Sequence, residues 1–164
     1  MYTGKRKTTY ERGKFKEEIH KALYKSDDLK ELLIGDISEM STSEVQSVFK
    51  KYVKSHLFVD DTIEETNSFI FYDVYFPTLD PNIKDCRIVM YAICHRDILD
   101  DYFQEGYCGN RADVLSEIIE DILINDEKVS LSFGIGKIAL DGVEIYNSKK
   151  MYGCIMTFNV PTFR

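Results

Sequence analysis

The apolar positions of the chain first follow a helical period. In residues 11–26 they recur every three to four positions, as on one face of a helix, and residues 27–33 continue this segment as a short turn that stops near Gly35. A second helix is predicted to begin at Ser41, because a Ser followed three residues later by Glu44 matches the capping box. Its apolar stripe consists of Val45, Val48, Phe49, Tyr52 and Val53.

The period changes to two after residue 62. Residues 68–76 are β-branched and aromatic and read as a strand that ends at Pro77. Residues 87–95 form the next strand, so residues 77–85 are predicted to be a loop between antiparallel neighbours. Asn110 is then expected to cap a helix over residues 112–124, whose apolar residues form a stripe wide enough to lie on a sheet.

Two further strands close the chain. Residues 137–146 alternate in part, whereas residues 151–160 place Tyr152, Cys154, Met156, Phe158 and Val160 on one face, with a hairpin turn at residues 147–149 between the two strands. The order of elements is α-α-β-β-α-β-β, which predicts an α+β fold with a four-stranded, mainly antiparallel sheet and helices packed on it. A length of 164 residues fits a single domain spanning residues 1–164, with a flexible basic N-terminal arm over about residues 1–10.

Two of the predicted strands are apolar on both faces. In residues 68–76, for example, Ile70 and Tyr72 share one face while Phe69 and Phe71 share the other. An antiparallel sheet that is half exposed to water shows polar residues on one side, so the second face needs a cover. Either the helices form one layer on each side of the sheet, or another subunit supplies the cover.

Composition narrows the class of protein. Apolar residues make up 44% of the chain, but they never form the run of about 18 that a membrane span requires. No apolar run follows the first basic residues, so we expect no secretory signal and synthesis in the cytoplasm. The four cysteines are scattered, which favours reduced thiols packed as small apolar groups.

No motif for catalysis, a cofactor or a metal emerges. The glycines before Lys137 lack the Walker spacing, and Ile138 replaces the Ser or Thr that would follow the lysine. Cys94 and His95 are adjacent in a strand, so their side chains point to opposite faces and cannot form a nucleophile and base pair. No second pair of ligands accompanies them, as a structural zinc site would require. We therefore predict no catalytic residue, no cofactor and no metal site.

The second half of the chain resembles a family of phage proteins. The resemblance runs over residues 68–163 and is carried by four segments: Asp85-x-Arg87 through His95-x-Asp97, the helix of residues 111–123, Phe133-Gly134-Ile135-Gly136-Lys137, and the closing strand. These segments resemble the tail-completion, or tail-terminator, proteins at the neck of tailed bacteriophages and phage-tail-like particles. The resemblance implies a non-enzymatic virion protein that forms a hexameric ring, ends the tail tube and joins it to the head connector while DNA passes through without specific binding.

Two groups of residues are candidates for the contacts of such a ring. The connector after the second strand gathers acidic and aromatic residues, which suit a partner surface: Asp97, Asp100, Asp101, Tyr102 and Phe103. The N-terminal arm carries Lys5, Arg6 and Lys7 in a chain with a net charge of −7, so it is expected to reach an acidic partner.

Two other readings remain open. One is a small metal-dependent phage enzyme, such as a nuclease, that uses the carboxylates of Asp97, Asp100 and Asp101. The other is an adaptor that binds a host protein as a monomer or dimer.

Overall fold

The structure, a computed structural model, describes all residues except 1–7, 58–62, 64, 81–82, 127–136 and 164. The helical elements are α1 (Thr8–Lys25), α2 (Asp27–Leu33), α3 (Thr42–Tyr52), the 3₁₀ turn η1 (Arg96–Ile98), α4 (Arg111–Glu120) and the π-helical turn η2 (Asp121–Asn125). The strands are β1 (Val53–Lys54), β2 (Ser68–Leu79), β3 (Ile83–His95), β4 (Ala139–Asn147) and β5 (Met151–Phe163).

The predicted α+β class is correct, but the sheet has five strands and not four. Their spatial order is β1-β2-β3-β5-β4; β1 runs parallel to β2, and the other neighbours are antiparallel. The added strand begins at Val53, which the sequence pattern placed on a helix. Val53 is extended (φ −120°, ψ 111°) and pairs with Ile70. A strand of two residues is too short to leave an alternating pattern.

The N-terminal region contains one more helix than predicted. Ser26 is an extended N-cap whose hydroxyl accepts a hydrogen bond from the Leu29 N–H, so residues 27–33 start a separate helix, α2, where a turn was expected. The predicted caps at Ser41 and Asn110 are confirmed, and Asn110 with Asp113 forms a complete capping box. Residues 8–10 of the predicted arm belong to α1, and residues 1–7 lie outside the described residues.

The loop predicted over residues 77–85 is mostly strand. β2 continues through Pro77 to Leu79, and β3 begins at Ile83. Pairing with β3 shifts register between Tyr75 and Thr78, and an irregularity of this kind tolerates a proline because no ladder hydrogen bond is required there. The hairpin turn after β4 is confirmed: the Ser148 N–H donates to the Met151 carbonyl over 2.9 Å.

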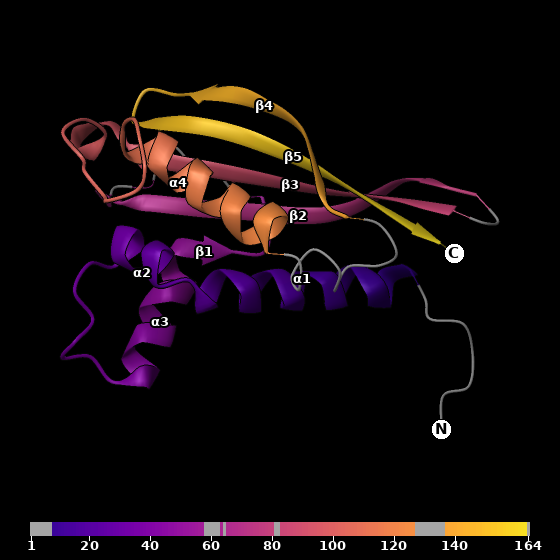
Figure 1. Cartoon of the computed structure of the whole chain (residues 1–164), viewed down its shortest axis with the longest axis horizontal. Helices are drawn as coiled ribbons and strands as arrows, with labels where there is room; N and C mark the ends of the chain where they lie inside the picture. The colour runs from indigo at the N-terminus through magenta and orange to yellow at the C-terminus, as the bar shows by residue number, and fades with distance from the viewer. Residues whose placement is uncertain (1–7, 58–62, 64, 81–82, 127–136, 164) are drawn as a thin grey trace.

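The helices cover one face of the sheet. In Figure 1, α4 crosses in front of the strands and α1 runs alongside the β1–β2 edge. Residues from all four α-helices join one buried cluster with the same face of β2, β3 and β5, including Tyr72, Met90 and Phe158. A helical layer on each side, one of the two covers we considered, is therefore not what the described residues form.

The second face has a smaller apolar cluster. Phe69, Phe71, Ile93 and Met151 are buried in it, and the half-buried residues around them are Tyr52, Ile63, Tyr91 and Tyr146. Tyr52, the last residue of α3, is the one helical residue in this cluster among the described positions. This face is thus packed mainly by its own aromatic side chains.

Gly153 lies at the closest approach between two central strands. It belongs to β5 and pairs with Ile93 on one side and Tyr146 on the other. A Cβ atom at this position would lie 2.0 Å from the Ala92 carbonyl oxygen, which real contacts do not allow. Glycine is therefore required here by the backbone of β3.

We predict that Gly153→Ala destabilises the fold, because the new methyl group forces β3 and β5 apart. The loss in free energy of unfolding should be on the order of 1–3 kcal/mol, as for other overpacked sites. Urea denaturation followed by circular dichroism measures it. Gly142→Ala in β4 is the matched control, since a Cβ there meets nothing within 4 Å; equal midpoints for the two variants would contradict the prediction.

Candidate functional site

The connector between β3 and α4 is anchored at its base and exposed at its tip. Asp97, Asp100 and Asp101 are exposed, and the Phe103 ring is 82% exposed. Asp101 adopts a positive φ of 61°, a conformation that Asp tolerates better than most residues. The predicted contact residues therefore lie at the surface, with the exception of Tyr102.

Tyr102 points inward and helps to hold the connector in place. The Arg111 guanidinium lies 4.1 Å from the centre of its ring, and Arg111 also donates to the carbonyl oxygens of Ile98 and Leu32. The Tyr102 hydroxyl donates to the side chain of Gln104, which is buried and donates in turn to the Asp28 carbonyl. The connector is thereby attached to α2, and it presents Phe103 on a fixed support.

A hollow of about 870 Å³ lies beside this connector. Tyr102 and Phe103 line one side of it, and residues 34–37 at the end of α2 line the other. Asp97, Asp100 and Asp101 are not among its lining residues, so the structure separates the acidic and aromatic parts of the predicted contact surface.

A second hollow, of about 610 Å³, lies where α1, α3 and β1 meet. Its lining includes four lysines, Lys16, Lys21, Lys50 and Lys54, and two histidines, with Glu17 as its one acid. Burial, and then the charge of Lys50, lower the pKa of His20 from its ordinary value. We call this surface the basic edge. The sequence pattern did not reveal it, because its lysines come from three separate elements.

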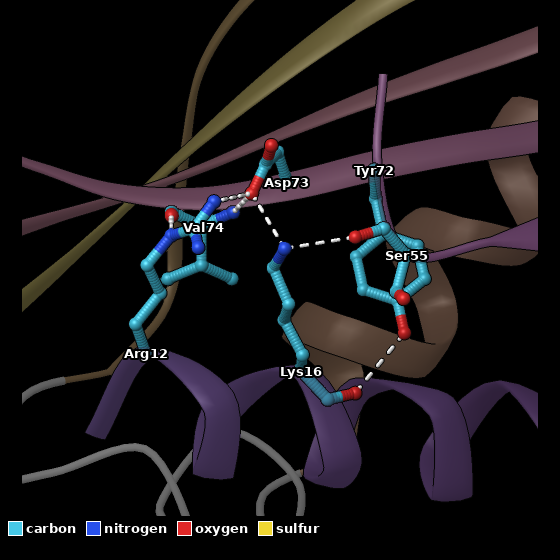
Figure 2. A network of polar contacts seen from close by, with 6 residues as sticks. All are labelled: Arg12, Lys16, Ser55, Tyr72, Asp73 and Val74. Carbon is cyan, nitrogen blue, oxygen red and sulfur yellow. Dashed lines mark hydrogen bonds and ion pairs between the residues drawn. The ribbon is translucent and has the colours of Figure 1, made fainter. Parts of the chain in front are cut away.

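Asp73 fixes the position of the basic edge on the sheet (Figure 2). Its carboxylate receives Lys16 at 2.8 Å and Arg12 at 2.6 Å, and both cations come from α1. Arg12 also donates to the Val74 carbonyl, and Lys16 to the Ser55 carbonyl just after β1. Partial burial raises the pKa of Asp73, but hydrogen bonds from Lys16 and the Val74 N–H and the two nearby cations outweigh it, so the pKa lies below its usual value.

The opposite edge of the sheet is apolar with an acidic border. β4 is paired with β5 alone among the described residues, and its Val143 and Ile145 are 56% and 73% exposed. Between these residues and α4 lies a hollow of about 320 Å³, bordered on the helix by Glu117 and Glu120. We call this surface the β4–α4 groove. The described residues leave its strand edge without a partner, a situation that proteins usually avoid.

The side chains that could serve as nucleophile, base or metal ligand do not form a common site among the described residues. Cys94 faces the helices and contacts the Ser68 hydroxyl, whereas the His95 ring accepts a hydrogen bond from the Asp97 N–H, so the two adjacent side chains diverge as predicted. Burial raises the pKa of the Cys94 thiol to about 11. All four cysteines are free. In the part of the chain that the structure describes, no three His, Cys, Asp or Glu side chains converge to form a metal site.

The remaining candidates lie outside the described residues. These are Lys5, Arg6 and Lys7 of the arm, and Gly134 and Gly136 of the glycine pair.

Comparison with known proteins gives one family. A family model described as YomW matches residues 16–160, which is most of the chain and includes every strand from β1 to β4. The chain belongs to the YomW family. The name has the form of a Bacillus prophage gene name and indicates a phage-associated protein. No curated protein sequence matches this YomW-family chain. Among its described residues, no helix is both long and apolar enough to cross a membrane.

We predict that Asp73→Asn destabilises the protein at neutral pH and much less in acid. Because the pKa of Asp73 is lowered on folding, its carboxylate stabilises the native state above the ordinary carboxyl pKa of about 4, and this contribution is lost as the pH falls through the lower folded value. Denaturation of both proteins between pH 7 and pH 2.5 measures the difference. Asp100→Asn, at an exposed position, should show no such convergence; a constant deficit at Asp73 across this range would contradict the prediction.

Proposed function

We propose that this YomW-family protein is a structural subunit of a phage or prophage particle, and that it forms a ring at the neck that ends the tail tube and joins it to the head connector. The observation that carries the proposal is the exposed apolar edge of the sheet. Val143 and Ile145 project from a strand that no other described strand covers, and such an edge is a ready site for another protein chain.

The shape of the subunit supports a ring more than a closed pair. β1 and β4 occupy opposite ends of the sheet, and one end is lined by lysines while the other is apolar with acids along its border. A ring requires two different and complementary surfaces on each subunit, whereas a two-fold dimer uses one surface twice. The phage-like family name supports a role in a phage particle, and the resemblance to tail-completion proteins is the reason for proposing the neck as the position of the ring.

The overall charge suits a passage for DNA. A net charge of −7 gives the chain as a whole the same sign as a DNA duplex, and like charge around a channel prevents phosphates from sticking. The connector adds three exposed carboxylates and Phe103 on a rigid base, which fits contact with a tube or connector protein.

Deletion of the gene from the phage or prophage that carries it tests the proposal. Particles made without the protein should have overlong tails or tails that lack heads, because nothing ends the tube or joins it to the head. Electron microscopy of induced lysates measures tail length and head attachment, and the wild-type gene supplied from a plasmid is the control. Normal particles would overturn the proposal, and would leave a host-binding adaptor as the reading to pursue.

We further predict that Phe103→Ser lowers the yield of joined particles without changing stability. The Phe103 side chain is 82% exposed, so its removal destabilises the fold little. An exposed aromatic residue on a fixed support nevertheless supplies contact area to a partner. Plaque or particle counts and a thermal melt of the purified protein measure the two effects. Phe103→Tyr keeps the ring and should preserve the yield; a normal yield from Phe103→Ser would remove the connector tip from the interface.

A further inference from the structure

The β4–α4 groove combines an apolar base with unneutralised acids. Val143 and Ile145 face the same side of the sheet as α4, since they pair with Met156 and Cys154, whose side chains contact the helical layer. The helix does not reach far enough to cover them, and they stay more than half exposed. Glu120 on the border of the groove makes no ion pair with any described residue, so its charge is available to a partner.

The basic edge has the complementary composition. Lys50 and Lys54 make no ion pair within the part of the chain that the structure describes. Leu57 follows His56 of this lining in the sequence and is 40% exposed, so this part of the surface also presents an apolar side chain. The lysines and Leu57 are thus complementary in charge and polarity to the acids and apolar side chains of the groove.

The two surfaces cannot satisfy each other within one molecule. They lie at opposite edges of a five-stranded sheet, about 19 Å apart at the usual strand spacing, which is more than twice the Debye length of about 8 Å at physiological salt. A symmetric contact of groove with groove would bring Glu117 and Glu120 against the same residues of the second copy. Like charges placed face to face oppose such a dimer.

We propose that the β4–α4 groove of one copy receives the basic edge of the next copy of this chain. In this contact Leu57 lies against Val143 and Ile145, while Lys50 and Lys54 approach the carboxylates of Glu117 and Glu120. Repetition of the contact gives a head-to-tail assembly, which closes into a ring if the rotation between copies allows it. The inference rests on the proposed function and names the surfaces through which the ring forms.

A pair of charge-reversed chains tests the contact. The groove variant carries Glu117→Lys and Glu120→Lys, and the edge variant carries Lys50→Glu and Lys54→Glu. Each variant alone should self-associate at least on the order of tenfold more weakly than the wild type, because like charges then meet at every contact. An equal mixture should assemble again, since each variant's groove then faces an edge of opposite charge on the other. Sedimentation velocity and native mass spectrometry at matched concentrations measure the species.

Controls separate the contact from folding. Glu39→Lys with Glu44→Lys makes the same change in net charge as the groove variant, at exposed positions that line neither surface, and should associate like the wild type. Circular dichroism and thermal melts should show all variants folded. For a variant that proves unfolded, the charge-neutral Ile145→Ser change, at a residue 73% exposed, tests the same groove without reversing a charge.

Several results would overturn the inference. Variants that assemble normally by themselves would show that the ring uses other surfaces, while the neck function could still hold. A mixture that fails to recover would show that the groove and the basic edge do not meet in the assembly. A wild-type chain that stays monomeric at all concentrations would also overturn the inference, whatever the particle phenotype shows. Retardation of duplex DNA that is lost in the edge variant, with self-association unchanged, would assign the basic edge to a polyanion.

Discussion

The fold depends on one constraint: a sheet with apolar side chains on both faces receives its helices on one face alone. The larger buried cluster joins all four α-helices to one side of β2, β3 and β5, and the second face packs its own aromatic side chains. Because one short helix, α4, is the cover nearest β4, the apolar side chains of that edge strand extend beyond the helical layer. The exposed groove therefore follows directly from how the core is closed, and its exposed residues Val143 and Ile145 are not part of the larger buried cluster.

The charges of the chain are separated along the same axis. Cations from α1, α3 and the end of β1 gather at one edge of the sheet, and acids from α4 border the other. Asp73 sets this arrangement, since it joins Lys16 and Arg12 of α1 to β2 and so offsets part of their positive charge (Figure 2). Lys50 and Lys54 make no ion pair with any residue that the structure describes. The net charge of −7 is therefore unevenly distributed, and the two edges of the sheet differ in charge.

Local patterns in the sequence predicted most of the regular elements and little of the proposed contact surfaces. The apolar spacing placed Met156 and Phe158 on one face of the last strand, which the structure buries, and short polar motifs placed the caps at Ser41 and Asn110. β1 was missed because a strand of two residues is too short to show an alternating pattern. The β2–β3 hairpin was predicted too short because Pro77 usually ends a strand, although the register shift at this point of the hairpin tolerates a proline. The residues of the basic edge come from separate segments of the chain, and so do those of the β4–α4 groove. Each surface therefore becomes visible only once the tertiary structure, including the order of the strands, is known. The acidic connector was visible as a run, but its division into exposed acids and an inward Tyr102 depends on Arg111, nine residues farther along the chain.

Some residues of the proposed contact surfaces lie outside the buried core, so they affect assembly and folding differently. Val143, Ile145 and Phe103 are largely exposed, so their replacement removes contact area from a partner and leaves the buried clusters intact. Asp73 differs, because it holds α1 on the sheet and thereby also positions the lysines of the basic edge. Loss of its charge in acid would weaken the fold and displace one contact surface together. In the head-to-tail assembly that we propose, folding and assembly are therefore coupled at the α1 edge of the sheet and independent at the β4 edge, so contacts at the β4 edge could change with little cost to the fold.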